Sequence, residues 1–340
     1  MPKDGLFYIA KKDWDDFLKS LLDQYEIFTP QKNDGEIVWK GLNEEAIADI
    51  VYDRYRATQP LKPFFYQFLE RVSPKLMGEE RGRLILGAKN CDLRGITVLD
   101  KLFLGGEFVD PFYNERRKKS VVITTDCTDA KEVCFCVLAG YDPFPKDGFD
   151  INLTVVQDGF LAEVGSDVGE RFISIKQDLW KSPDPDRVKE RDTLRENLIN
   201  KIKEINRDFK FKKSLSDIIR ENYKHPVWEE EARTCVSCGA CTNICPSCNC
   251  FLLADIEDGD RFAKLKYWDT CQYAGFGRVA GGANPRKELY ERFRNRYLCK
   301  YNYKPEAIGM VSCTGCGRCI EACTGKIDMR KVIYRLQTKT

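Results

Sequence analysis

Two stretches of the sequence repeat one cysteine spacing, Cys235-x2-Cys238-x2-Cys241-x3-Cys245-Pro246 and Cys313-x2-Cys316-x2-Cys319-x3-Cys323-Thr324. A four-iron, four-sulfur cubane presents its irons at the corners of a tetrahedron. Three thiolates spaced along a turning loop therefore bind three irons, and a fourth thiolate arrives from elsewhere in the chain. The spacing predicts two 4Fe-4S clusters, whereas zinc bound through Cys-x2-Cys pairs does not require the third and fourth cysteines of each run.

The ligands of these two clusters are expected to cross between the runs. In two-cluster ferredoxins the last cysteine of each run ligates the other cluster. Glycines within the runs fit a close approach of the backbone to cluster sulfide, and these are Gly239, Gly315 and Gly317. The crossed rule assigns Cys235, Cys238, Cys241 and Cys323 to cluster I, and Cys313, Cys316, Cys319 and Cys245 to cluster II.

Four further cysteines lie in the first half of the chain. Cys91 follows a predicted strand over 83–88 and precedes a helical stretch over 93–103, and Cys127 follows a predicted strand over 120–125. A helix N-terminus at Cys91 would favour its thiolate form. We favour a third iron-sulfur cluster at these residues, with buried structural thiols or a zinc site as the alternatives. The proposed set is Cys91, Cys127, Cys134 and Cys136.

The remaining thiols are Cys248, Cys250, Cys271 and Cys299. Cys248 and Cys250 follow Pro246 so closely that one of them can replace Cys245 as a ligand, or both can line the cluster site. Ligation of a further centre by all four is a less favoured alternative.

Composition and pattern predict an α+β chain. The 340 residues are 43% hydrophobic and 32% charged, as in ordinary globular proteins of two domains. Residues 1–180 are expected to form an α/β domain that carries the third site. A charged helical connector over 181–233 leads to a helical dicluster ferredoxin-type domain over 234–340. Within the first domain we expect helices over 9–24 and 44–56, strands over 83–88 and 120–125, and hairpins over 25–40 and 152–164.

Several function classes are excluded by what the sequence lacks. It contains no apolar run of membrane-spanning length and no secretion signal, which predicts a cytoplasmic protein without a membrane partner. Sixteen cysteines in a reducing compartment indicate metal ligands rather than disulfides. The single histidine rules out Rieske centres and HExxH metalloproteases. No nucleotide-binding glycine motif is present.

The region after residue 260 is strongly basic. It holds 17 basic and 6 acidic residues, among them Arg292, Arg294 and Arg296. We interpret this excess as compensation for anionic clusters and as a docking face for an acidic partner, rather than as a nucleic-acid site.

Motifs across residues 60–335 resemble the family that unites sulfhydrogenase beta subunits with iron-sulfur subunits of anaerobic sulfite reductases. That resemblance implies a cytoplasmic iron-sulfur electron-transfer subunit of an anaerobic oxidoreductase. Its implied partners are a diaphorase-type subunit that binds flavin and NAD(P), together with a catalytic hydrogenase or sulfite reductase subunit. Thr324 departs from the proline common after the last cysteine. The motifs are residues 87–94, 103–111, 134–136, 245–251 and 268–271.

These observations favour a chain that transfers electrons and has no catalytic residues of its own. The alternative is an enzyme subunit that uses Cys248, Cys250 and Cys271 for thiol–disulfide chemistry or substrate reduction. A redox-sensing regulator would need a DNA-binding element, and the sequence shows no helix-turn-helix signal.

Overall fold

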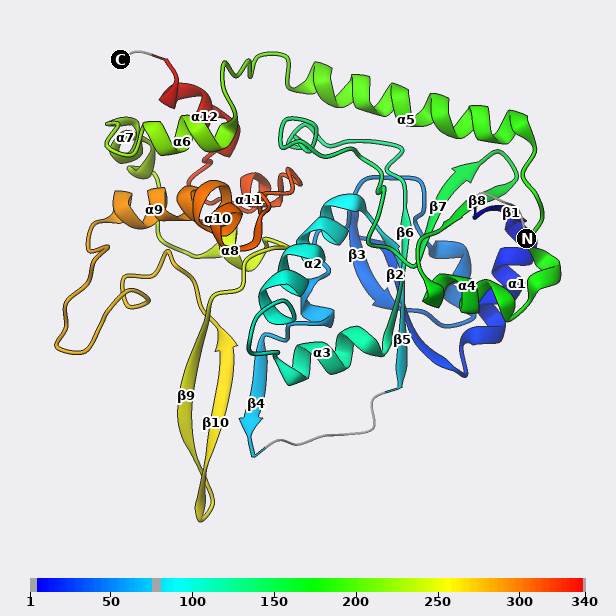
Figure 1. Cartoon of the computed structure of the whole chain (residues 1–340), viewed down its shortest axis with the longest axis horizontal. Helices are drawn as coiled ribbons and strands as arrows, with labels where there is room; N and C mark the ends of the chain where they lie inside the picture. The colour runs from blue at the N-terminus through cyan, green and yellow to red at the C-terminus, as the bar shows by residue number, and fades with distance from the viewer. Residues whose placement is uncertain (1–4, 75–80, 339–340) are drawn as a thin grey trace.

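The computed structural model describes residues 5–74 and 81–338. Its first half is built on a seven-stranded sheet, and its last third is mostly helical (Figure 1). The strands of the large sheet are β1 (Leu6–Ala10), β2 (Tyr25–Asn33), β3 (Glu36–Gly41), β5 (Gly82–Ala88), β6 (Ser120–Thr125), β7 (Ile151–Val156) and β8 (Gly159–Val164). Their order is β1-β8-β7-β6-β5-β2-β3, with β2, β5, β6 and β7 parallel and the outer strands antiparallel.

Helices cover both faces of this sheet. Because side chains alternate along a strand, Leu84 and Leu86 of β5 pack in one core cluster and Ile85 packs in another. The first cluster includes α1 (Lys11–Leu21) and α4 (Asp167–Ser174), and the second includes α2 (Asn90–Phe103) and α3 (Pro111–Lys118). The result is an α/β sandwich of three layers.

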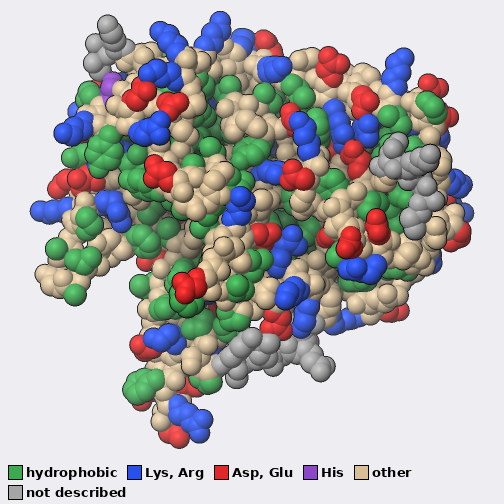
Figure 2. Space-filling view, in the orientation of Figure 1, with side chains coloured by type: hydrophobic (Ala, Val, Ile, Leu, Met, Phe, Trp, Pro, Cys, Tyr) green, Lys and Arg blue, Asp and Glu red, His purple; other side chains and the backbone are tan. Residues whose placement is uncertain are grey.

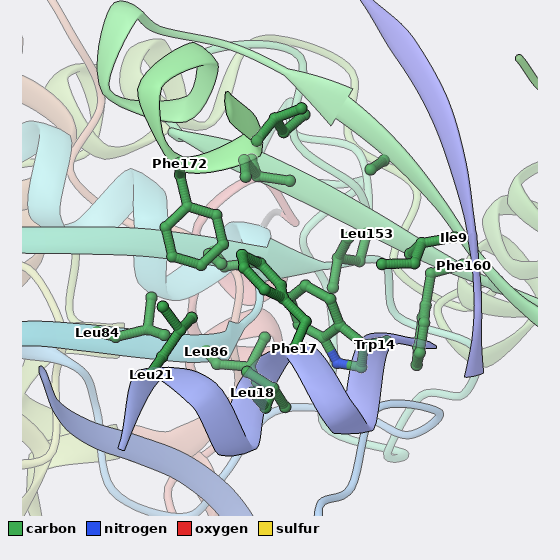
Figure 3. Packing of buried hydrophobic residues seen from close by; sticks show 14 of the residues in the cluster. Ile9, Trp14, Phe17, Leu18, Leu21, Leu84, Leu86, Leu153, Phe160 and Phe172 are labelled. Carbon is green, nitrogen blue, oxygen red and sulfur yellow. The ribbon is translucent and has the colours of Figure 1, made fainter. Parts of the chain in front are cut away.

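Helix α1 supplies the largest side chains of the first cluster. Trp14, Phe17, Leu18 and Leu21 are completely buried because they follow the helical repeat on one face of α1. Figure 3 shows them against strand side chains such as Leu153. The Trp14 indole donates a hydrogen bond of 2.9 Å to the Tyr52 hydroxyl, so its polar atom is also satisfied.

The sequence predictions of local structure were mostly confirmed in this half. Both hairpins and both strands are present. The helix expected over 9–24 begins only at Lys11, because Ile9 belongs to β1. The helix expected over 44–56 was wrong. Only a 3-10 turn, η1 (Glu45–Asp49), forms there, because the next residues pair with the β2 edge: the Val51 amide donates to the Pro30 carbonyl.

The connector and the C-terminal region are helical. Helix α5 (Pro185–Ile205) lies along the large sheet, where Arg195 bridges Asp126 and Glu163. A second apolar core joins the helices that follow, with Trp228 and Tyr297 at its centre. The elements after α5 are α6 (Leu215–Glu221), α7 (Val227–Ala232), α8 (Ala240–Asn243), α9 (Leu289–Leu298), the π-helical turn η4 (Cys299–Tyr303), α10 (Lys304–Ile308), α11 (Arg318–Glu321) and α12 (Met329–Leu336).

A long hairpin interrupts the helical region. Strands β9 (Phe251–Asp258) and β10 (Arg261–Trp268) pair with each other, and β10 also pairs with β4 (Leu69–Ser73). The hairpin projects from the body of the molecule (Figures 1 and 2). Our sequence interpretation missed it, although Asp258-Gly259 at its turn is a recognised hairpin signal.

Asp110 joins this hairpin to the large domain. Its carboxylate caps α3 by accepting hydrogen bonds from the Phe112 and Tyr113 amides, and it pairs with Lys266 of β10 at 2.8 Å. We expect Asp110→Ala to lower the free energy of unfolding by about 1 kcal/mol through loss of the cap. Asp110→Asn should lose less, because its amide oxygen still caps the helix. Anoxic denaturant unfolding of both variants measures the difference, and equal losses would contradict the capping argument.

Among the described residues, none of the helices combines the length and the hydropathy needed to cross a bilayer.

Candidate iron-sulfur sites

The structure brings the four predicted cluster I thiols to one cavity. Cys235, Cys238 and Cys241 come from the loop around α8, and Cys323 comes from the loop after α11. Cys319, which the crossed rule assigns to cluster II, also lines this cavity. The last cysteine of the second run therefore lies with the first three cysteines of the first run, in the arrangement that crossed ligation requires.

Polar atoms without partners surround the same cavity. Arg296 and Tyr297 line it, and both the Arg296 Nε and the Tyr297 hydroxyl are buried without a hydrogen-bond partner among the described residues. A buried donor left unpaired costs about 1–3 kcal/mol. Burial opposes the charge on Arg296, but the Cys241 and Cys319 thiols nearby hold its pKa well above the usual value. An anionic cluster would accept from these donors, so the residues fit such a group.

The predicted cluster II thiols are buried close to one another. Cys245, Cys313 and Cys316 are among the buried residues, and Cys319 lies near enough to Cys316 and Cys245 for both thiols to raise its pKa after burial itself. Lys300, only 3% exposed, donates a hydrogen bond of 3.0 Å from Nζ to the Cys245 sulfur. A thiolate at Cys245 thus has a buried positive partner.

The four N-terminal cysteines line a second cavity. Strands β5 and β6 are parallel neighbours, so their carboxyl ends meet at one edge of the sheet. Cys91 lies in the first turn of α2 after β5, and Cys127 follows the end of β6. Cys134 and Cys136 reach the same cavity from the loop between β6 and β7, together with Gly315 and Cys316 of the second run.

Burial dominates the ionisation of these N-terminal thiols. It raises the pKa of Cys91 well above the ordinary value and that of Cys127 to about 12. The lowered pKa that we expected from the helix N-terminus at Cys91 is therefore not found for the free thiol. Bound iron would displace the proton, because a coordinating thiol is deprotonated. Arg56 also lines this cavity, and its Nη1 is buried without a partner among the described residues.

Two glycines of the second run have a role other than the expected approach to sulfide. A Cβ atom built on Gly315 would lie 2.4 Å from the Cys136 Cα, and one on Gly317 would lie 2.2 Å from the Val133 carbonyl oxygen. Both glycines also have positive φ. Their missing side chains let the Cys134–Cys136 loop contact the second run, where the Phe135 amide donates to the Gly315 carbonyl at 2.8 Å.

The three arginines of the basic region do not form the expected docking face. Arg292, Arg294 and Arg296 are all less than 9% exposed. Arg292 donates to backbone carbonyls, Arg294 lies over the Tyr223 ring, and Arg296 lines the first cavity. The positive charge at these three positions therefore faces the thiols and the protein interior rather than a partner.

Within residues 5–74 and 81–338, no three side chains of His, Cys, Asp or Glu converge closely enough to hold a single metal ion. Thiolates around a cubane stand farther apart than those around one ion, because each binds a different iron. The zinc alternative thus finds no geometric support among these residues.

Comparison with known proteins defines the class first. Residues 234–327 match the model of the 4Fe-4S dicluster domain, so this part of the chain is such a domain. Over 333 residues the chain is 33% identical to sulfhydrogenase 2 subunit beta of Pyrococcus furiosus, an alignment that covers 94% of each protein. The chain belongs to the family of sulfhydrogenase beta subunits, as the sequence motifs predicted. No solved structure matches it significantly.

Proposed function

We propose that this chain relays single electrons between a flavin- and NAD(P)-linked diaphorase-type subunit and a catalytic subunit of the hydrogenase or sulfite reductase type. Three thiol sets support the proposal by their adjacency. Cys319 of the second run borders the cavity of the first run, and Cys316 borders the cavity of the N-terminal set. Clusters bound at these sites would supply reversible one-electron chemistry.

The protein's own residues prepare this path by excluding water and supplying positive charge. The thiols of Cys91 and Cys134 both lie within the electrostatic influence of Cys316, and Cys241 lies within that of Cys319. Buried cations next to the thiols stabilise the more negative, reduced form of each centre. All sixteen cysteines are unpaired, which fits a role in the reducing cytoplasm.

The relay is tested by removing one centre from the purified anoxic complex. Cys127→Ser should lose about four irons per chain. NAD(P)H-driven turnover should fall with it, while turnover of the catalytic subunit with an artificial one-electron donor stays unchanged. Thr128→Ser is the matched control and should keep both rates. A Cys127→Ser complex that lacks the irons and retains full NAD(P)H-driven turnover would refute the relay through this site.

The partners are tested separately. A tagged full-length chain expressed in its native cells and captured from anoxic extract should bring down a flavoprotein and a catalytic subunit. Capture of the catalytic subunit without a flavoprotein would refute the diaphorase-type partner.

Lys300 should tune the centre that Cys245 ligates. Replacing Lys300 by methionine removes a buried charge and a hydrogen bond to sulfur, both of which favour reduction. We expect the reduction potential of that cluster to fall by on the order of 100 mV, since a charged hydrogen bond contributes about 1.5–3 kcal/mol. Lys300→Arg, which keeps the charge, should shift the potential less. Redox titration followed by electron paramagnetic resonance measures both variants, and an unchanged potential in Lys300→Met would contradict the expected tuning.

A further inference from the structure

Four cysteines outside the three sites gather at the base of the projecting hairpin. We call Cys248, Cys250, Cys271 and Cys299 the hairpin-base thiols. Cys250 and Cys271 flank the hairpin on its two sides, Cys248 precedes it, and Cys299 begins the π-helical turn η4. Such turns are rare, and they occur frequently at functional sites.

The hairpin itself brings two of these thiols together. Phe251 and Trp268 are paired at its base, and the Asp269 amide donates to the Cys250 carbonyl at 3.0 Å. The chain then turns at Thr270, whose hydroxyl accepts hydrogen bonds from the Thr242 hydroxyl and the Gln272 amide. Cys271 is thereby held beside Cys250.

All four sulfur atoms lie within mutual reach. Cys271 is hydrogen-bonded to Cys250, and Cys250 lies within the electrostatic influence of Cys248 and Cys299. Cys248 in turn contacts Cys245, the predicted cluster II ligand. The hairpin-base thiols thus form one group next to an already assigned centre.

Buried positive charge without carboxylate partners surrounds this group. Lys62, Lys300 and Lys304 are 2%, 3% and 8% exposed. Lys62 donates to the Cys248 carbonyl at 3.2 Å, and Lys304 donates to the Ser247 carbonyl at 2.6 Å. Among the described residues, none of the three forms an ion pair with an Asp or Glu. Since a buried charge without a counter-charge is strongly unfavourable, this region calls for a negative group.

We propose that Cys248, Cys250, Cys271 and Cys299 hold an additional iron-sulfur cluster. Four thiolates match the ligand count of a 4Fe-4S centre, and an anionic cluster would satisfy the three lysines. The Cys248-x-Cys250 pair repeats the spacing of Cys134-x-Cys136, and in each set two further thiols arrive from other segments. The site stands on its own contacts and does not depend on the relay. It would place a centre beside both dicluster sites, at the root of the hairpin.

The total metal content of the full-length chain gives the first test. Two clusters would supply about eight irons, the N-terminal set about four more, and the hairpin-base thiols about four more again. The anoxically reconstituted protein should therefore contain about sixteen irons and a matching amount of acid-labile sulfide. A content of about twelve, with the N-terminal irons present, would overturn the proposal.

Variants locate the irons. Cys250→Ser and Cys299→Ser should each lose about four irons, whereas the neighbouring Asn249→Ser control should lose none. Combining Cys250→Ser with Cys127→Ser should remove about eight, because the two sites are separate. If Cys127→Ser loses no iron but Cys250→Ser does, the N-terminal centre of the relay fails and the hairpin-base centre stands.

One outcome would instead support the thiol–disulfide alternative. Anoxically purified protein can be denatured with a chelator and labelled at its free thiols. A Cys250–Cys271 disulfide in that protein, with unchanged iron in Cys250→Ser and Cys299→Ser, would overturn the cluster. Four labelled thiols at these positions, together with the iron losses, are the expected result.

Discussion

Replacing Asp92 by alanine is expected to lower the free energy of unfolding by about 3–5 kcal/mol, the cost of breaking a buried ion pair. Asp92 lies in α2 and pairs with Arg318 of α11 at 2.8 Å, and both side chains are 1% exposed. Asp92 also accepts a hydrogen bond from the Leu61 amide. The variant would leave the Arg318 guanidinium buried without its counter-charge, at the contact between the sheet domain and the second cysteine run.

A surface ion pair of the same helix provides the control. Arg94 of α2 pairs with Asp147 at the same distance of 2.8 Å, but the Asp147 side chain is 72% exposed. Asp147→Ala should change stability by less than about 1 kcal/mol, because solvent screens the pair. Denaturant unfolding of both variants under anoxic conditions measures the two effects. Equal losses would show that burial does not set the strength of the Asp92–Arg318 pair.

Gly315→Ala is expected to destabilise the protein by about 2–5 kcal/mol and to deplete the N-terminal irons. The added methyl group would lie 2.4 Å from the Cys136 Cα, on a backbone with φ of +65°. Left-handed backbone costs a non-glycine residue about 1–2 kcal/mol, and overpacking adds about 1–3 kcal/mol. Relief of the clash would move the Cys134–Cys136 loop away from its cavity.

Gly309 allows the two contributions to be separated. Its φ is +71°, but no atom outside its chain neighbours lies within 4 Å of the position that a Cβ would take. Gly309→Ala should therefore show the backbone cost of about 1–2 kcal/mol alone and keep its full iron content. Iron analysis and unfolding of both variants provide the comparison. A Gly315→Ala protein with all its iron would contradict the role of this contact.

Local signals in the sequence were sufficient where one segment decides the outcome. The period-two hairpin around 152–164 and the strands before Cys91 and Cys127 could be recognised because their side chains alternate within a few residues. The segment 44–56 misled us because its amphipathic pattern was overridden by pairing with the β2 edge, a partner outside the segment. The β9–β10 hairpin was missed because its largely exposed strands have little apolar alternation.

For the metal sites, spacing along the chain determined how many thiols share a loop, since offsets of two or three residues keep them within one turn of backbone. Spacing could not determine which distant loops meet. Only the tertiary structure decided that the Gly315 loop contacts Cys136, that α2 packs on Pro246 at Gly95, and that the hairpin joins Cys250 to Cys271. The physical reason is that these contacts depend on missing side chains and buried ion pairs between segments separated by more than a hundred residues, or on strand pairing across the hairpin.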